Sequence, residues 1–334
     1  MAFNSSLVLS ALTAYVDQIS FDQILTEIVL KGRTGTLVQN QRGIKNARTI
    51  NTTISSLIIQ PAGCGLISPT GSVTLNQQTL TVCPLMVQES ICLVGPGSLE
   101  TVWAGQKMPE GSNYDSLTPD VFAKAYMADK INKLQDANEM LVWQGSTTGA
   151  SFGTLPTYQS VNQDQCNGFL QILTQTSASM SVVLTGTAYS GALAVGTAIA
   201  AVDYIVDTLT TQLPNLLDQT DLYMFMSFAN YRTYVRALRN ANYYHFGAME
   251  DADTIGWSIL IPGTNIRAVA TSGLVGSTYI VTTTGSNLYI GTDGVDEQNS
   301  FEIWKSQDYN TIFFRSMWKL GVVVAYPQYV VLYD

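Results

Sequence analysis

Charged side chains are scarce in this chain of 334 residues. Asp, Glu, Lys and Arg make up 12% of it, the hydrophobic residues make up 46%, and the formal net charge is −9. An ordinary soluble domain carries about twice that charged fraction. Most solvent-facing positions must therefore hold Ser, Thr, Asn or Gln, which protect a surface only weakly against association. Such a surface suits a subunit of a dense assembly, and the composition is equally compatible with a thinly charged soluble protein.

The residues and motifs of common catalytic sites are also missing. The chain has a single histidine, His245, between Tyr244 and Phe246, and we expect a packed or surface side chain and not a general base. Neither a P-loop nor a glycine-rich dinucleotide motif occurs. The acidic run at residues 293–297 lacks the spacing of a calcium loop, so we interpret it as a solvated turn. The sequence predicts no enzyme activity, no metal site and no cofactor.

The sequence also lacks the patterns of a membrane span, a signal peptide and a CxxC cysteine pair. No apolar run reaches the about 18–20 residues of a membrane span, and residues 1–20 lack the basic start and apolar core of a signal peptide. The cysteines form no CxxC pair; they are Cys64, Cys83, Cys92 and Cys166. We therefore favour reduced cytoplasmic thiols over a disulfide or metal framework.

The stretch that organises the chain is a predicted long helix over residues 119–144. Pro119 and Asp120 suit a first helical turn, no Gly or further Pro interrupts the segment, and Gly145 follows as a C-cap. With one wider gap, apolar residues recur every three or four positions: Phe122, Ala125, Ala128, Ile131, Leu134 and Leu141. Charged residues fill other positions: Lys124, Asp129, Lys130, Lys133, Asp136 and Glu139. The pattern predicts one amphipathic spine helix.

The N-terminal region reads as a docking arm. Two short amphipathic patterns in residues 3–30 predict helices too short to be stable unless they dock on another surface. The candidate inter-subunit or lumen-facing residues follow in a segment without acidic residues: Lys31, Arg33, Arg42, Lys45 and Arg48. We favour ion pairs with a neighbouring chain or a solvated arm, and contact with nucleic-acid phosphate is the alternative.

Charge almost disappears in the next segment. No basic residue occurs between Arg48 and Lys107. β-branched residues are frequent on both sides of a turn at residues 69–72, which predicts two long strands. A two-stranded ribbon is marginal alone and exposes its edges. We therefore predict that residues 50–100 form an extended hairpin that lies across a neighbouring subunit.

The second half of the chain mixes helix and strand patterns in the manner of an α/β layer. Helices are predicted from an N-cap at Thr197 to residue 213, and over residues 228–239. Strand patterns occur at residues 222–226, 266–270, 279–283 and 287–290 and in the tail 301–332. With the hairpin, these elements give an α+β fold class.

The order of the segments resembles that of the major capsid proteins of tailed double-stranded DNA bacteriophages, which share the Hong Kong 97-like fold. The segment EMLVWQG at residues 139–145 is similar to the end of the family's spine helix. Other similar stretches lie at residues 167–170, 221–238, 287–293 and 319–324. Part of the sequence also resembles the crAss-like phages of gut bacteria.

The resemblance implies four regions. They are an N-terminal arm at residues 1–48, an extended loop at 49–105, a peripheral domain at 106–160 and 300–325 with the spine helix at 119–144, and an axial domain at 161–299 and 326–334. The extended loop has no lysine, so the lysine–asparagine cross-link of some relatives is not expected.

The resemblance also implies a function. The chain would self-assemble into hexamers and pentamers of an icosahedral shell around phage double-stranded DNA, in a virion assembled in the host cytoplasm. Implied partners are further copies of the chain, portal, scaffold and minor capsid proteins, and packaged DNA through weak contacts, with no membrane. The alternatives are an encapsulin-like nanocompartment shell, which shares the fold, and a phage tail or adhesin subunit.

Overall fold

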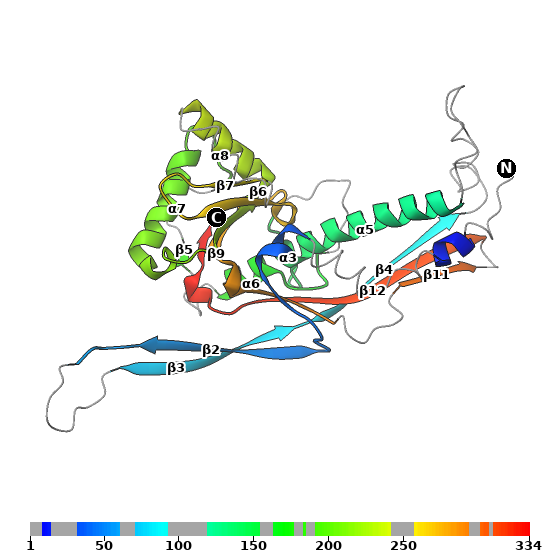
Figure 1. The fold of residues 1–334 in the computed structure, drawn as a ribbon, viewed down its shortest axis with the longest axis horizontal. Coiled ribbons are helices and arrows are strands. Elements are labelled where there is room, and N and C mark those ends of the chain that lie inside the picture. Colours follow the sequence, from blue (N-terminus) through cyan, green and yellow to red (C-terminus); the bar gives the residue numbers. More distant parts are fainter. Residues whose placement is uncertain are drawn as a thin grey trace.

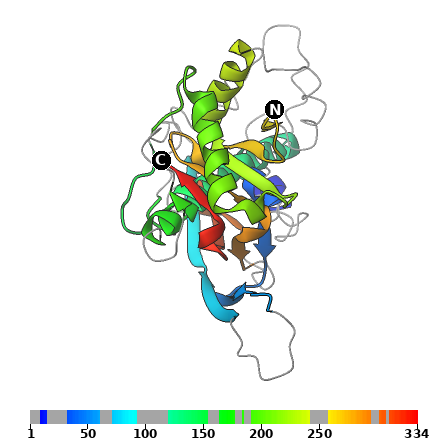
Figure 2. The same cartoon turned by 90° about the vertical axis from the view of Figure 1, so that its left-hand side faces the viewer.

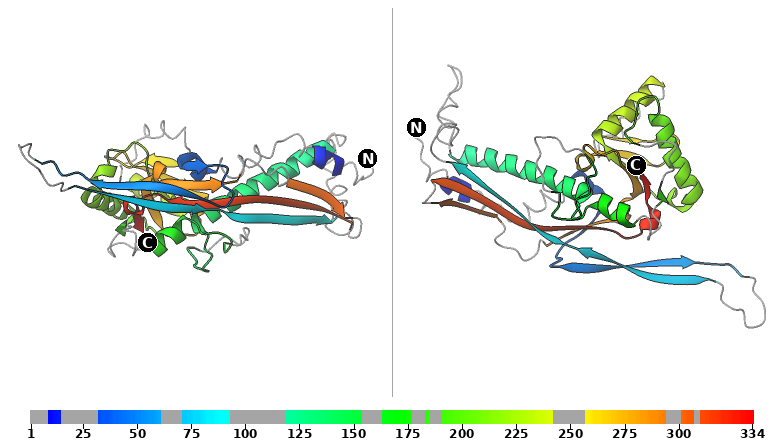
Figure 3. Two further views of the ribbon diagram at one scale, coloured as in Figure 1. Left: turned by 90° about the horizontal axis from the view of Figure 1, so that it is seen from below. Right: turned by 180° about the vertical axis from the view of Figure 1, so that it is seen from behind.

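The computed structural model describes residues 9–14, 32–60, 71–92, 119–153, 163–176, 183–184, 191–241, 257–293, 301–306 and 310–334. These residues form an elongated subunit (Figures 1 and 3). A long helix runs beside a long sheet, a second sheet with its own helices stands at one end of them, and a hairpin projects past that end.

The predicted spine helix is α5, Pro119–Gln144. Three residues of its predicted apolar face are buried: Ile131, Leu134 and Leu141. Ala128 is exposed, contrary to the prediction, and Met127 is buried beside it. The side chains of Phe122, Lys124 and Ala125 lie outside the described part of the chain.

The C-terminal turns of α5 differ from an amphipathic helix. Every residue from 138 to 146 is buried, including Glu139, which the charge pattern placed on the solvent side. Three elements surround this end of α5: α3 (Arg33–Leu37), α6 (Phe169–Thr176) and the 3-10 turn η5 (Ser272–Leu274). Along its described middle part, α5 therefore buries one side, and at its C-terminal end it is buried on all sides.

The long sheet is built around β12, Thr311–Val324. β12 pairs antiparallel with three strands: β4 (Cys83–Cys92), β10 (Leu288–Thr292) and β11 (Phe301–Ser306). The short β1 (Gln39–Gln41) adds to β10 in parallel. Burial alternates along the first ten residues of β12, and the buried side faces α5, where Trp318 Nε1 donates to Asn138 at 3.0 Å. This alternation is typical of an antiparallel sheet with one covered face.

The second sheet has six strands in the order β5-β13-β9-β6-β8-β7. They are β5 (Val183–Leu184), β6 (Leu222–Ser227), β7 (Ser258–Leu260), β8 (Arg267–Thr271), β9 (Ile280–Thr284) and β13 (Val331–Tyr333). The strands predicted at residues 222–226, 266–270 and 279–283 are confirmed. The strand predicted at 287–290 is present as β10 but pairs with β12, so it joins the long sheet and not its sequence neighbours.

Helices cover both faces of the second sheet. α7 (Ala198–Gln212) and α8 (Phe228–Asn240), both predicted, lie on one face and share a core with Met224 and Met226 of β6. The alternate residue Phe225 points to the other face, where its ring lies 5.1 Å from that of Trp143 at the end of α5. The β6 strand is thus buried on both sides, and its Phe225 side shares the main core with the spine helix.

The predicted hairpin is confirmed in its outer part. β2 (Ala47–Ser56) and β3 (Ser72–Thr81) pair antiparallel from Ala47–Thr81 at the base to Ser56–Ser72 near the tip (Figures 1 and 2). The prediction that the hairpin continues through residues 83–92 is wrong. β4 pairs with β12 along its whole length, and Leu85 lies in the main core. The edge of β12, in the same chain, therefore provides the backbone hydrogen-bond partners of β4.

Some predictions fall largely outside the described residues. Of the predicted N-terminal helices at 3–30, residues 9–14 are described and helical, with Ala11 and Leu12 buried. His245 and Lys31 are among those not described.

Candidate assembly surfaces

The hairpin presents apolar side chains to solvent. Leu57 and Ile59 are 92% and 99% exposed, and the full set, here named the hairpin patch, is Ile54, Leu57, Ile58, Ile59, Val73 and Leu75. Two paired strands rarely hold together in water without a further covering layer. Exposed apolar side chains on a strand pair mark an interaction site or an aggregation hazard. The hairpin patch is therefore the first candidate surface for contact with another chain.

A buried carboxylate on α5 binds helix α3. Glu139 is 5% exposed and accepts three hydrogen bonds. Thr34 of α3 donates its backbone N–H at 2.7 Å and its hydroxyl at 2.6 Å, and Thr271 at the end of β8 donates its hydroxyl at 3.1 Å. Trp143 Nε1 donates to the Thr34 hydroxyl at 2.7 Å. One side chain of α5 thereby joins α3 to the second sheet.

Opposing effects act on the pKa of Glu139 at this junction, and burial is the largest of them. Burial raises the pKa of Glu139 above its ordinary value, while the hydrogen bonds from Thr34 and Thr271 and the positive charge of Arg33 act in the opposite direction. All three bonds are donated to Glu139, which suits an ionised carboxylate because that form only accepts. The neighbouring Gly32 has no room for a side chain, since a Cβ there would collide with the Glu139 carboxylate.

The structure separates the candidate basic residues. Arg33 is partly buried inside its own chain: its guanidinium donates to the Ala270 carbonyl at 2.8 Å and lies 5.8 Å from the Phe228 ring centroid. Desolvation lowers the pKa of Arg33. Arg42, Lys45 and Arg48 are exposed near the base of the hairpin. Their predicted role toward a neighbour or the lumen stays a prediction.

The acidic run predicted as a solvated turn begins with a buried residue. Asp293 directly follows β10, and its carboxylate forms an ion pair with Lys319 of β12, with 2.7 Å between Oδ2 and Nζ. The same Lys319 ammonium donates to the backbone carbonyl of Lys45 at 3.1 Å. Adjacent strands of the long sheet bring these residues together. Lys319 thus links β12 to the segment that leads into the hairpin.

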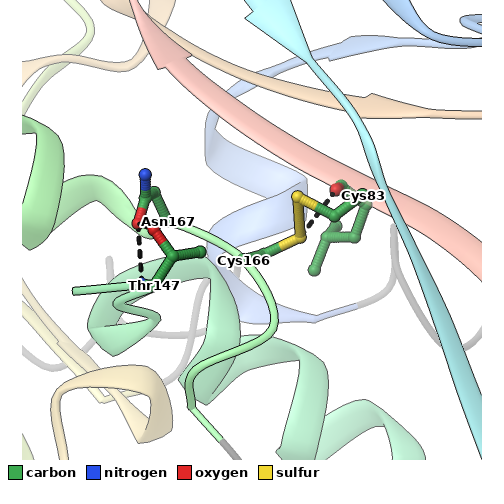
Figure 4. Close-up of a disulfide and its surroundings, with 5 residues drawn as sticks. Cys83, Thr147, Cys166 and Asn167 are labelled. Carbon is green, nitrogen blue, oxygen red and sulfur yellow. Dashed lines mark hydrogen bonds between the residues drawn. A yellow bond between two sulfur atoms is a disulfide. The ribbon is translucent and has the colours of Figure 1, made fainter. Parts of the chain in front are cut away.

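Cys83 and Cys166 form a disulfide, which corrects the expectation of reduced thiols (Figure 4). Their Cα atoms are 5.9 Å apart although 83 positions separate them in sequence. The first residue of β4 passes beside the turn that precedes α6, so only the tertiary fold makes them neighbours. Cys92 is exposed and outside this bond, and Cys64 is not among the described residues.

The turn that carries Cys166 is itself fixed to the end of α5. Gly168 N–H donates to the Gly145 carbonyl at 2.7 Å. Thr147 donates its backbone N–H at 2.9 Å and its hydroxyl at 2.8 Å to Asn167 Oδ1, as Figure 4 shows for this pair. A Cβ at Gly145 or Gly168 would overlap neighbouring backbone, so the close approach requires glycine at both positions. The disulfide therefore connects the hairpin base to a rigid part of the subunit.

The described residues include no group of three or more His, Cys, Asp or Glu side chains placed to hold a metal ion. In the same part of the chain, every helix is too short or too polar to cross a membrane.

The fold is similar to those of solved phage structures. No protein-family model and no curated protein matches this sequence. Among solved structures, a chain of the satellite phage P4 procapsid is similar with a TM-score of 0.55 at 12% identity, over 99% of this chain and 91% of that one. A chain from Mycobacterium phage Ogopogo gives 0.51 at 12% identity over 90% of each chain. The capsid of Myoviridae phage XM1 gives 0.50 at 13% identity over 91% of each.

These similarities extend over nearly the full length of both partners, while the identity is low. What is shared is the fold, and the chain has the Hong Kong 97-like fold of phage capsid subunits.

Proposed function

We propose that this chain is a major capsid protein, a structural subunit that self-assembles into an icosahedral shell around phage double-stranded DNA. The hairpin patch carries the proposal. In a subunit with a capsid fold, a ten-pair ribbon extends from the body and the side chains of the hairpin patch lie in water. A neighbouring copy that covered this ribbon would bury these side chains, and closure by symmetry would repeat the contact at every subunit.

Four regions follow from this proposal. We assign residues 1–48 to the arm, 49–105 to the extended loop, 106–160 and 300–325 to the peripheral domain, and 161–299 and 326–334 to the axial domain. Two strands inside these ranges are exceptions: because β4 and β10 pair with β12, we propose that Cys83–Cys92 and Leu288–Thr292 belong to the peripheral domain. We infer that Lys31, Arg42, Lys45 and Arg48 pair with acidic groups of adjacent subunits, which a chain of net charge −9 supplies in number.

The proposal extends to partners and location. The subunit belongs to a virion assembled in the host cytoplasm, with portal, scaffold and minor capsid proteins as separate chains. DNA contacts are weak, because an acidic subunit attracts phosphate poorly and a tight lining would oppose packaging and release.

The test is assembly by the full-length chain and by a hairpin-shortened variant. Asn51 and Gln77 face each other in the ladder, so residues 52–76 can be replaced by a two-residue Asn-Gly turn without changing the register below them. We expect closed particles from the full-length chain in electron micrographs, alone or with its scaffold protein. The shortened variant should remain a folded, soluble subunit that forms none.

Other outcomes identify other functions. Tubes or isolated trimers would point to a tail or adhesin subunit, and closed particles that enclose protein cargo in place of DNA would point to an encapsulin-like shell. Normal particles from the shortened variant would show that the hairpin patch does not carry assembly.

A further inference from the structure

Helix α8 gathers positive charge on one exposed side. Its arginines are spaced four and three residues apart, at Arg232, Arg236 and Arg239, which places them on one side of the helix. All three are exposed, and α8 contains no acidic residue. In a chain with only sixteen basic residues, three on one helical surface are a marked concentration.

The neighbouring helix α7 has the opposite charge. It contains Asp203 and Asp207, four residues apart and both exposed, and no basic residue. Partial burial raises the pKa of Asp203, and the like charge of Asp207 adds to the shift. Across the described ranges, no ion pair joins either aspartate to an arginine of α8. The subunit therefore presents both charges without neutralising them internally.

An ordered tryptophan lies next to the arginines. Trp257, which is 58% exposed, packs edge-on against Phe228 and Tyr231 of α8, with ring centroids 5.5 and 6.3 Å away. Phe228 lies one turn before Arg232 on the same helix. Trp, Tyr and Arg are enriched in the residues that contribute most to protein–protein binding. A tryptophan already held by two rings loses little freedom when a partner covers it.

The two helices form one layer of the subunit. α7 contacts β13 and α8 contacts β6 and β8, so the helices lie side by side over the same face of the second sheet (Figures 1 and 2). One side of this layer is acidic and the other is basic. When copies are related by rotation about an axis, a contact between two different surfaces of the same chain repeats head to tail and closes into a ring.

We propose that the basic α8 surface, defined as Arg232, Arg236, Arg239 and Trp257, docks on α7 of a second copy of this chain and closes the rings of the shell. This inference rests on the proposed function and names the residues of one contact within it. A second copy fits better than nucleic acid. The aspartates of α7, in the same layer, would repel phosphate, whereas in a copy they supply the charge that the arginines need.

A charge-swap experiment with the full-length chain tests the contact. The first variant is R232E/R236E/R239E, the second is D203R/D207R, and the third combines both sets. Either set alone places like charges opposite each other, so we expect about a tenfold or larger fall in the yield of rings and closed shells. The combined variant again has opposite charges across the contact, and its yield should return to about half the native value or more. R232Q/R236Q/R239Q is the matched neutral control and should lose less than the reversed set.

The readouts separate this inference from the proposed function. Rings are measured by sedimentation, shells by electron microscopy, and subunit folding by thermal unfolding, which should be nearly unchanged because the replaced side chains are exposed. Native yields from both single sets, or no recovery in the combined variant, would overturn the α8–α7 contact while leaving shell formation intact. Charge-dependent rings from a native chain that closes no shell would support the contact and contradict the proposed shell function. A native chain that forms neither rings nor shells would contradict both.

Discussion

The Glu139 junction is enclosed within the subunit, whereas the hairpin patch is exposed to solvent. At the junction, α3 and β8 supply the three hydrogen bonds that the buried carboxylate of Glu139 on α5 accepts from within the chain. At the hairpin, Leu57 and Ile59 remain in water on a ribbon that the described residues leave largely uncovered. The stability of the subunit therefore resides at the junction, and its capacity for association resides at the hairpin. The same chemical change should have very different consequences in the two places.

The largest expected effect is at the junction. Glu139→Ala leaves three donors on Thr34 and Thr271 without an acceptor inside the core. We expect a loss of about 3–5 kcal/mol in the free energy of unfolding, measured by urea titration of the unassembled subunit. Glu139→Gln keeps the shape and part of the hydrogen bonding, so it should cost clearly less. Equal and small losses for both variants would contradict the role given to this carboxylate.

The disulfide comes next. Cys83→Ser/Cys166→Ser should lower the free energy of unfolding by about 2–4 kcal/mol under oxidising conditions, because the bond closes a long loop in the unfolded chain. Adding reductant to the native protein should bring it to the level of the variant. Cys92→Ser is the control and should change little, since Cys92 is exposed on β4 and lies outside the bond. A native protein unaffected by reductant would contradict the prediction.

The pH dependence of the junction is a subtler effect. Because burial raises the folded-state pKa of Glu139, the folded state favours the protonated form more than the unfolded chain does. The stability that this group contributes is therefore greatest below the ordinary glutamate value and falls as pH rises through the raised pKa. The difference in free energy of unfolding between native protein and Glu139→Gln should fall as pH rises above the ordinary glutamate pKa. A difference that grows with pH would mean that the hydrogen bonds outweigh burial.

The smallest effect on the subunit is expected at the hairpin. Leu57→Ser/Ile59→Ser replaces side chains that are already solvated, so the free energy of unfolding should change by no more than about 0.5 kcal/mol. Assembly should nevertheless fail or slow, as seen in particle counts by electron microscopy. Leu85→Ser on β4, where the side chain is in the core, is the contrasting variant and should destabilise the subunit itself. A hairpin variant that unfolds the subunit would break the comparison.

Local signals were sufficient for much of the fold. The bounds of α5 follow from Pro119 and Gly145, and strand and helix patterns located β6, α8, β8 and β9. Pairing partners were not predictable in the same way. The strand pattern of β4 is the same whether it pairs with β12 or with another chain, and the proximity of Cys83 to Cys166 exists only in the folded subunit.

The burial of Glu139 was not predicted from the sequence. A charge among the polar positions of an amphipathic helix is normally solvated, which is why it was assigned to the outer face. A signal was nevertheless present, because the next four residues, Met140 to Trp143, are apolar on every side of the helix. A run of this kind predicts an enclosed helix end, and a carboxylate beside it then needs donors from elsewhere. Those donors, Thr34 and Thr271, lie more than a hundred positions away in sequence, so the partners themselves could not be named.

The continuous path from β3 into β4 has a mechanical consequence. A pull on the hairpin tip would act along β4, whose residues pair with β12 along its whole length, so the ladder is loaded in shear and its hydrogen bonds share the force. At Cys83, the first residue of β4, the disulfide would divert part of that load to the turn beside the end of α5. Force applied at the most exposed part of the subunit is therefore transmitted to its most enclosed part, and the spine helix bears tension that originates outside its own chain.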